Sequence, residues 1–322
     1  MSSGIAGIDG GGTRTRAALV DESGALLGLV EAGGSNLQLV GMDGLERVLE
    51  DLWSRLGTGI LPLRSLCLGL AGAGRKPEQE EAAGLVRRRG WAAQVRVMSD
   101  AEAALEGAYG GGPGVVAIAG TGSIVMGTNR RGERVRAGGW GPLLGDEGSG
   151  YAMALEALRA VLRSRDGWDA GTALAQELQE ALGLADWDQL VRQVYGGELT
   201  RERIAALNPR VFAVARDGDA VAGRIVAAAG AALGRQVAAV AHRLGLVPQA
   251  QVVCSGGVLT SERDALWPAL ADAAAESGVD LRLREPQLPP VLGAVLSAWR
   301  LAGLQMDPGL VDRLARHTPP TG

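Results

Sequence analysis

The sequence of 322 residues predicts an α/β protein made of two duplicated halves, each with the order strand, strand, strand, helix, strand, helix, that face each other across a cleft. Three observations carry this prediction. An apolar run, a glycine turn and a second apolar run open the chain and recur from residue 115. The strand-helix-strand pattern that closes the first half recurs at residues 251–285. Between the halves, the segment GGGPG at residues 110–114 has the composition of a domain boundary.

The elements of the first half follow from apolar runs and their periodicity. We expect strands at residues 5–8, 16–20, 25–33, 66–74 and 94–98, and helices at residues 42–56, 77–89 and 100–109. The strand at 66–74 ends in small residues, which leave room for a ligand at the carboxyl end of a strand, where clefts of α/β proteins open. The N-terminal domain is therefore expected to span residues 1–112.

The second half repeats these strands and adds helices. Strands at residues 115–139, 251–258 and 280–285 and a helix at 261–275 are the counterparts of the first half. Helical inserts are expected at residues 150–165, 172–182, 187–195 and 219–244, where apolar residues recur at helical spacing. This C-terminal domain spans residues 113–322, although the sequence leaves open whether the last helix, 291–304, packs on the N-terminal domain. The tail at 318–322 is expected to be disordered.

The glycine turn of the first hairpin indicates a phosphate ligand. Asp9 is followed by Gly10, Gly11, Gly12 and Thr13. Because glycine has no Cβ, backbone N–H groups in such a turn can close on an anion. The carboxylate of Asp9 would repel a phosphate unless a divalent cation lay between them, so a nucleotide with Mg²⁺ is the ligand that fits. The alternative is a tight hairpin without a ligand.

Two other phosphate-binding motifs are excluded. A P-loop needs a lysine after its last glycine, but the only lysine of the chain is Lys76, which precedes Pro77. A dinucleotide-binding fingerprint needs a helix after its glycines, whereas these glycines lead into a strand.

Composition narrows the functional class further. The net charge of -4 gives no basic surface for nucleic acid, and no apolar run reaches the ~20 residues of a membrane span. Without an N-terminal signal pattern, we expect a cytoplasmic protein. The two cysteines, Cys67 and Cys254, lie in apolar strand-like runs, and the two histidines, His242 and His317, are isolated. A disulfide or a zinc site is therefore not expected.

Five motifs occur in order along nearly the whole chain. They are IDGGGTRT (8–15), SDAEAAL (99–105), AGTGS (119–123), GGWGPLLGDEGSGY (138–151) and CSGGV (254–258). Together they resemble the BadF/BadG/BcrA/BcrD ATPase family within the actin, Hsp70 and hexokinase superfamily, and within that family its N-acetylglucosamine kinases. This resemblance implies two ribonuclease H-like, actin-like ATPase domains with mixed five-stranded sheets flanked by helices. It also implies a homodimer.

The resemblance also implies roles for individual residues. Asp9 would hold Mg²⁺ through water, and Asp100 would be the general base that takes the proton from the 6-hydroxyl of the sugar. The residues that would contact ATP are Gly10, Gly11, Gly12, Thr13, Gly120, Thr121, Gly122, Ser123, Gly256 and Gly257. The residues that would bind the amino sugar are Asn36, Asp100, Gly138, Gly139, Trp140 and Asp146.

Each candidate side chain also has an ordinary structural interpretation. Asp100 follows a strand and starts a helix, so it could be a helix N-cap. Asn36 could cap a turn, and Trp140 could be a core residue rather than a ring stacked on the sugar. Asp146 and Glu147 stand before a helix start, where acidic residues are favoured without any ligand.

Other functions remain open at this point. The family includes glucosamine kinases, and the intact GGWG…GDEGS segment favours N-acetylglucosamine only modestly. It also includes ATP-driven activators that hold an iron-sulfur cluster through cysteines, a role that Cys67 and Cys254 do not suit. A sugar kinase of the ROK type would carry a cysteine-rich zinc motif, which the sequence lacks. A non-catalytic sugar or nucleotide sensor on the same fold is the alternative from another class.

Overall fold

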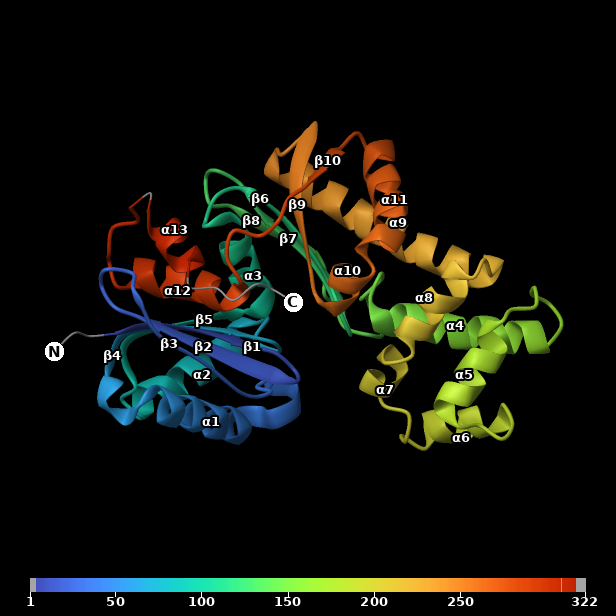
Figure 1. Ribbon diagram of the computed structural model, residues 1–322, viewed down its shortest axis with the longest axis horizontal. Helices are drawn as coiled ribbons and strands as arrows, with labels where there is room; N and C mark the ends of the chain where they lie inside the picture. The colour runs from blue at the N-terminus through green and yellow to red at the C-terminus, as the bar shows by residue number, and fades with distance from the viewer. Residues whose placement is uncertain (1–3, 308, 317–322) are drawn as a thin grey trace. The chain divides into compact units, whose positions relative to one another are not determined.

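The computed structural model describes residues 4–307 and 309–316, which form two compact units. The first unit comprises residues 1–113 and 285–322, and the second comprises Gly114–Arg284. Figure 1 shows the elements of each unit by label. The tail at 318–322 and His317 lie outside the described residues.

The first unit contains a five-stranded sheet with the order β3-β2-β1-β4-β5. Its strands are β1 (Ile5–Gly10), β2 (Arg14–Val20), β3 (Leu26–Gly33), β4 (Leu63–Leu70) and β5 (Ala92–Ser99). The helices are α1 (Leu37–Leu56), η1 (Thr58–Ile60), α2 (Lys76–Arg88), α3 (Asp100–Tyr109), α12 (Pro290–Leu301) and α13 (Leu310–Ala315). Strand β1 pairs antiparallel with β2 and parallel with β4, so the sheet is mixed.

Alternation along β1 divides the core of this unit between the two faces of the sheet. Ala6 and Ile8 belong to the apolar cluster formed with α1 and α2, whereas Ile5 belongs to the cluster formed with α3 and α12. Helices α1 and α2 cover one face, and α12 and α3 cover the other (Figure 1). The central strand is therefore buried on both sides.

Close backbone packing attaches the C-terminal helix α12 to the first unit. A Cβ on Gly7 of β1 would overlap the backbone of α12, and a Cβ on Gly293 of α12 would overlap the backbone of α3. The guanidinium of Arg300 also pairs with the buried carboxylate of Glu106 at 2.6 Å. Residues 285–307 and 309–316 thus pack with the first unit, although the sequence analysis counted them with the second domain and left open only where the last helix packs.

The second unit repeats the sheet, with the order β10-β9-β6-β7-β8. Its strands are β6 (Gly114–Ala119), β7 (Ser123–Thr128), β8 (Arg134–Gly138), β9 (Gln249–Ser255) and β10 (Asp280–Leu283). Read from the other edge, this order is equivalent to that of the first unit, and β6 pairs antiparallel with β7 and parallel with β9. The expected duplication and the two mixed five-stranded sheets are confirmed.

The helices of the second unit are mostly insertions between β8 and β9. They are α4 (Gly150–Arg165), α5 (Leu174–Leu182), α6 (Asp188–Tyr195), α7 (Arg201–Ala205), α8 (Asn208–Arg216), α9 (Ala220–Leu244), α10 (Gly257–Ser261) and α11 (Arg263–Glu276). By length and composition α9 could cross a membrane, but 56% of its most apolar window is buried inside the protein, as in the core helix of a soluble domain.

Three local predictions need correction. Helix α1 begins at Leu37 rather than at residue 42, and its first turn is separated from the rest by a kink at Gly41, where φ is 63°. Helices α7 and α8 were not expected; α7 has five residues, which is too short to show helical periodicity. Helix α13, which follows α12, was missed for the same reason.

Candidate active site

The first glycine turn, residues 10–13, packs against the loop that follows β3. The N–H of Gly11 donates to the carbonyl of Arg14 at 2.9 Å, and the N–H of Ser35 donates to the carbonyl of Gly11 at 2.9 Å. A Cβ on Gly34 would overlap the backbone of Gly12, so this approach requires glycine. The exposed side of the turn, in contrast, is open: nothing lies within 4 Å of a Cβ on Gly12. The turn therefore presents accessible backbone, as an anion-binding turn must.

The ends of three parallel strands lie in one line beside this turn. Gly10 at the end of β1 is in register with Leu70 of β4, and Leu70 is in register with Ser99 of β5. Asp100 follows Ser99 directly, and the N–H of Ala71 after β4 donates to the carbonyl of Gly10 at 2.8 Å. The structure thus brings the glycine turn and Asp100 to the same edge of the sheet, where α/β proteins bind their ligands.

Asn36 lies at this edge as well. Its Oδ1 accepts a hydrogen bond from the N–H of Gln38 at 3.0 Å and caps α1. A Cβ on Gly72, after β4, would lie 2.7 Å from that oxygen. The structural interpretation of Asn36 as a cap is therefore confirmed, and its binding of a sugar stays a prediction that would use the side-chain amide.

Asp100 is not the N-cap of α3, so that interpretation is wrong. Ser99 is the N-cap: its hydroxyl accepts from the N–H of Glu102, and the Glu102 carboxylate accepts from the N–H of Ser99 at 2.9 Å. This reciprocal capping box satisfies the helix start without Asp100. The Asp100 carboxylate accepts one bond, from the N–H of Ala101 at 2.9 Å, and its side chain is exposed. It is therefore available to a ligand.

The two acidic side chains of this edge both have raised pKa values. Burial, and after it the negative charge of Asp100, raise the pKa of Asp9 to about 7, although Arg16 and Arg14 oppose the shift. Although Asp100 reaches the surface, desolvation by the protein around it raises the pKa of its carboxyl too. Arg16 forms its ion pair with Glu31 at 3.0 Å rather than with Asp9.

This acidic edge suits Mg²⁺. The ion is commonly held by one or two carboxylates together with waters and substrate phosphates, rather than by a complete set of protein ligands. Asp9 is such a carboxylate, half-buried and with its negative form disfavoured until a cation is present. Within residues 4–307 and 309–316, no group of three or more His, Cys, Asp or Glu side chains could hold a metal. The donor set therefore fits a cation that arrives with a nucleotide.

The second unit carries the other glycine turn in the equivalent place. After β6, the N–H of Gly120 donates to the carbonyl of Gly122 at 2.9 Å, and the N–H of Gly150 at the start of α4 donates to the carbonyl of Gly120 at 2.8 Å. A Cβ on Gly256, where φ is 84°, would lie 2.5 Å from the carbonyl oxygen of Ala119. Gly257, which begins α10, lies beside Gly120. The predicted second phosphate turn and the predicted adenosine motif are thus adjacent.

Asp146 lies against this second turn and has an unusual conformation. Its φ is 65°, and it is the non-glycine residue with positive φ in the described part of the chain. Strain of this kind is retained where the surroundings enforce it and often marks a functional position. The side chain is buried, and Ser149, not Asp146, caps α4. The helix-start interpretation therefore does not explain Asp146.

Arg201 is the partner of Asp146, and the sequence analysis missed it. Its Nη2 donates to Oδ2 of Asp146 at 2.7 Å. Burial raises the pKa of Asp146, while Arg201 and the backbone N–H groups of Ser123 and Gly141 lower it. Arg201 is separated from Asp146 by 55 residues and lies on the short helix α7, so no motif pointed to it. The nearest signal is Thr200, a good helix N-cap residue.

The loop after β8 presents Trp140 at the surface. Gly138 and Gly139 have φ values of 71° and 69°, which allow the chain to turn there. The Trp140 side chain is 61% exposed, so its interpretation as a core residue is wrong. The guanidinium of Arg136 stacks over the ring at 4.5 Å from its centroid. Glu147 is exposed, and its carbonyl accepts from the hydroxyl of Ser123 at 2.8 Å.

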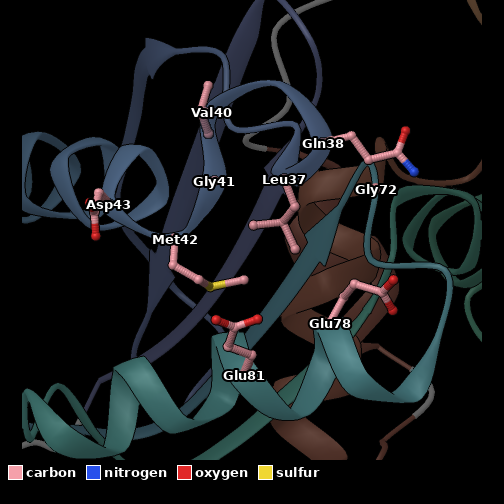
Figure 2. A pocket seen from close by; sticks show the side chains of 9 residues that line it. All are labelled: Leu37, Gln38, Val40, Gly41, Met42, Asp43, Gly72, Glu78 and Glu81. Atoms are coloured by element: carbon pink, nitrogen blue, oxygen red, sulfur yellow. The ribbon is translucent and has the colours of Figure 1, made fainter.

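A cavity of about 400 Å³ adjoins the Asn36 region of the first unit. Figure 2 shows that it is bounded by the kinked start of α1 and by Glu78 and Glu81 of α2. Gly72, which contacts Asn36, is part of its lining. The residues that line it are Leu37, Gln38, Val40, Gly41, Met42, Asp43, Gly72, Glu78 and Glu81. The sequence analysis did not identify this cavity, because it depends on the kink at Gly41.

Cys67 is a structural residue, and neither it nor Cys254 is in a disulfide. Cys67 is buried in β4, and burial raises the pKa of its thiol to about 12. A thiol of this kind is inert as a metal ligand or nucleophile.

Comparison with known proteins gives a consistent family assignment. The sequence profile of the BadF/BadG/BcrA/BcrD ATPase family matches residues 6–298. An N-acetylmuramic acid/N-acetylglucosamine kinase of Clostridium acetobutylicum is 33% identical over 262 residues, which are 80% of this chain and 86% of that protein. An N-acetyl-D-glucosamine kinase of Dictyostelium discoideum is 32% identical over 308 residues, or 91% of this chain and 96% of that protein.

A solved structure agrees with these relatives. The provisional N-acetylglucosamine kinase of Chromobacterium violaceum superposes with a TM-score of 0.71 at 28% identity, and the match covers 94% of this chain and 99% of that one. The fold of the two units is therefore the actin-like ATPase fold that the resemblance implied.

Proposed function

Because the chain belongs to the BadF/BadG/BcrA/BcrD ATPase family, we propose that it is an ATP-dependent amino-sugar kinase that phosphorylates the 6-hydroxyl of N-acetylglucosamine. The observation that carries this proposal is the position of Asp100. Its carboxylate stands at the ligand-binding edge of the sheet, in line with the first glycine turn, and the helix that it begins is capped by Ser99 instead.

Asp100 is the general base in this proposal. Its carboxylate takes the proton of the 6-hydroxyl while the oxygen bonds to the γ-phosphorus of ATP and the bond from that phosphorus to the β-phosphate oxygen breaks. The products are the sugar 6-phosphate and ADP, and the proton stays on Asp100 until solvent removes it. A raised pKa brings the base closer to the working pH, which improves proton transfer.

The other residues bind and neutralise charge, which is most of what phosphoryl transfer requires. Backbone N–H groups of the turns at residues 10–13 and 120–123 hold phosphate oxygens, and Gly256 and Gly257 leave space for the nucleoside. Asn36 and Asp146 bind sugar hydroxyls, and Gly138, Gly139 and Trp140 line the acetamido side. Asp9 would hold Mg²⁺, which supplies positive charge to the phosphates when it is bound.

The comparisons support an amino sugar as the acceptor and leave its exact identity to experiment. Two of the relatives bear N-acetylglucosamine in their names, and one of them also bears N-acetylmuramic acid. Glucosamine remains the runner-up. We also propose that the protein works in the cytoplasm, as its composition led us to expect. The resemblance implies a homodimer, which sedimentation analysis of the purified chain would test.

The experiment for this function is the identification of the product. The protein is incubated with ATP, Mg²⁺ and N-acetylglucosamine, and the phosphorylated sugar is examined by ³¹P NMR with coupling to the sugar protons. Phosphate on O6 is expected. Hydrolysis of ATP without a sugar phosphate would contradict the proposal and favour an ATPase activator, and no consumption of ATP would favour a sensor.

A further inference from the structure

The second glycine turn has a carboxylate pressed against it. A Cβ on Gly122 would lie 3.0 Å from Oδ2 of Asp146, and Asp146 is 3% exposed. If this turn holds phosphate oxygens, as the proposed function requires, an isolated aspartate here would repel them strongly in a region of low dielectric. A compensating positive charge is needed at the same place.

Arg201 supplies that charge. Its Nη2 is 2.7 Å from Oδ2 of Asp146 and would be 2.6 Å from a Cβ on Gly122. Its Cζ lies 6.0 Å from the centre of the Tyr151 ring, at the start of α4. The guanidinium is therefore held from one side by the acid and from another by the aromatic ring, with the glycine turn directly beside it.

The donors of Arg201 are not used up by these contacts. A guanidinium has five N–H groups, and the described hydrogen bond of Arg201 uses Nη2. Its Nε is buried without any hydrogen-bond partner. An arginine with spare donors is suited to an acceptor-rich anion such as a phosphate, which it binds through short charge-assisted hydrogen bonds.

Resting on the proposed function, we infer that Arg201 is a phosphate-contacting residue, and that it binds the terminal phosphoryl group of ATP while it keeps Asp146 in place for the sugar. We assign the terminal phosphate, rather than another phosphate of ATP, to Arg201 because this phosphate lies between the nucleotide and the sugar in the reaction. Arg201 touches the residue proposed to bind the sugar on one side and the turn proposed to bind phosphates on the other. The group that passes between sugar and nucleotide is the terminal phosphoryl.

The test compares ATP with ADP, which differ by that phosphoryl group. Arg201→Met removes the guanidinium and keeps an unbranched apolar stem. The matched control is Arg203→Met on the same helix, because Arg203 is exposed and donates to the backbone carbonyl of Glu198 instead. Calorimetry with Mg²⁺ measures the affinity of each variant for ADP and for a non-hydrolysable ATP analogue, and steady-state assays give kcat.

We expect Arg201→Met to weaken binding of the ATP analogue about tenfold more than binding of ADP, and to lower kcat about 10²-fold. Arg203→Met should leave both properties within about twofold of the unmodified protein. If Arg201→Met does not fold, Arg201→Lys carries the test, since a point charge should keep ADP binding and lose part of the selectivity for ATP.

An equal loss of ADP and ATP affinity, or a change confined to the KM for sugar, would overturn the inference, because Arg201 would then only hold Asp146. The binding comparison needs no sugar turnover. A protein that binds ATP through Arg201 but phosphorylates no sugar would thus contradict the proposed function alone. A protein that binds neither nucleotide would contradict both.

Discussion

The two glycine turns occupy equivalent places in duplicated sheets but manage charge differently. Asp9 of the first turn is half-buried, its pKa is raised to about 7, and the nearby Arg16 is paired with Glu31. Asp146 beside the second turn is fully buried and has its own arginine at 2.7 Å. The two units repeat the same sheet, but the charged side chains around their glycine turns differ. In the proposed function, a cation that arrives with the substrate would neutralise the first turn, whereas Arg201 already provides a positive charge beside the second.

The largest expected difference between the two units concerns the proposed base, Asp100, which lies in the first unit. We expect Asp100→Asn to lower kcat by about 10²–10⁴-fold, because the carboxylate that takes the proton is lost, and to leave ATP binding nearly unchanged. Steady-state kinetics and calorimetry measure the two properties. Ser99→Ala is the control: it removes the helix cap, costs about 1 kcal/mol of stability, and should retain turnover. Near-normal turnover in Asp100→Asn would remove Asp100 from the mechanism.

Substitutions beside the two turns should differ in their effect on the Mg²⁺ concentration that the reaction requires. Asp9→Asn is expected to raise the Mg²⁺ concentration needed for half-maximal rate by about tenfold or more, because the one carboxylate placed for the ion is gone. Arg201→Met should leave that concentration unchanged. Titration of Mg²⁺ at saturating ATP distinguishes them, and removal of the ion with EDTA should abolish turnover in the unmodified protein. Equal Mg²⁺ requirements in all three proteins would contradict the assignment of Asp9.

Stability against pH should show the same contrast in the metal-free protein. The pKa of Asp9 is raised from 3.8 to about 7, so the folded state holds this proton more tightly than the unfolded state. Its contribution to stability is complete below pH 4 and is lost as the pH rises to 7. Asp9→Asn should therefore gain stability relative to the unmodified protein across that window, on the order of a few kcal/mol.

Urea unfolding in EDTA at pH 4.5 and 7.5 measures this difference. The control is Asp21→Asn in the turn between β2 and β3. The hydroxyl of Ser23 holds the pKa of Asp21 below its usual range, so the stability that Asp21 contributes is present above the unfolded pKa and is lost as the pH falls. Asp21→Asn should thus show nearly the same loss of stability at both pH values, because both lie above the unfolded pKa of 3.8. A pH profile of Asp9→Asn parallel to that of the unmodified protein would mean that Asp9 is not desolvated.

The smallest expected effects concern glycines of the two turns. Gly256→Ala should destabilise the protein by about 1–3 kcal/mol, because φ is positive and the added Cβ would lie 2.5 Å from the carbonyl oxygen of Ala119. Gly12→Ala has open space around its Cβ and should change stability by less than about 0.5 kcal/mol. Thermal unfolding ranks the two variants. A reversed ranking would show that the exposed side of the first turn is not open.

Much of this fold follows from local sequence. The glycine turns, the apolar strands and the repeat of the whole pattern predict the strands of both sheets in chain order. The sequence could also have predicted that Ser99, and not Asp100, is the N-cap of α3, because Ser99 and Glu102 form the S-x-x-E signature of a capping box. Local patterns do not predict contacts between residues that are far apart in the sequence. Arg201 meets Asp146 across 55 residues, and Gly7 accommodates a helix that begins at Pro290.

The kink at Gly41 was missed for another reason, and the sequence left open whether Trp140 binds the sugar or lies in the core. The kink and the exposure of Trp140 both depend on glycines with positive φ, and a sequence does not say which of its glycines adopt that conformation. The cavity beside α1 and the surface position of the Trp140 loop follow from these conformations. The sequence therefore predicts the backbone turns for phosphate better than the side chains for the sugar. The spacing of the glycines predicts the turns directly, whereas the positions of the side chains depend on loop conformation.

The most direct test of the central claim is a coupled assay of ADP release with ATP and Mg²⁺ against N-acetylglucosamine, glucosamine, N-acetylmuramic acid, N-acetylmannosamine and glucose, with Asp100→Asn as the blank. We predict turnover that depends on sugar, is highest with N-acetylglucosamine, and is absent from the blank. Release of ADP at the same rate with and without every sugar would contradict the claim that this protein is an amino-sugar kinase, whereas equal sugar-dependent rates in Asp100→Asn would contradict only the assignment of the base.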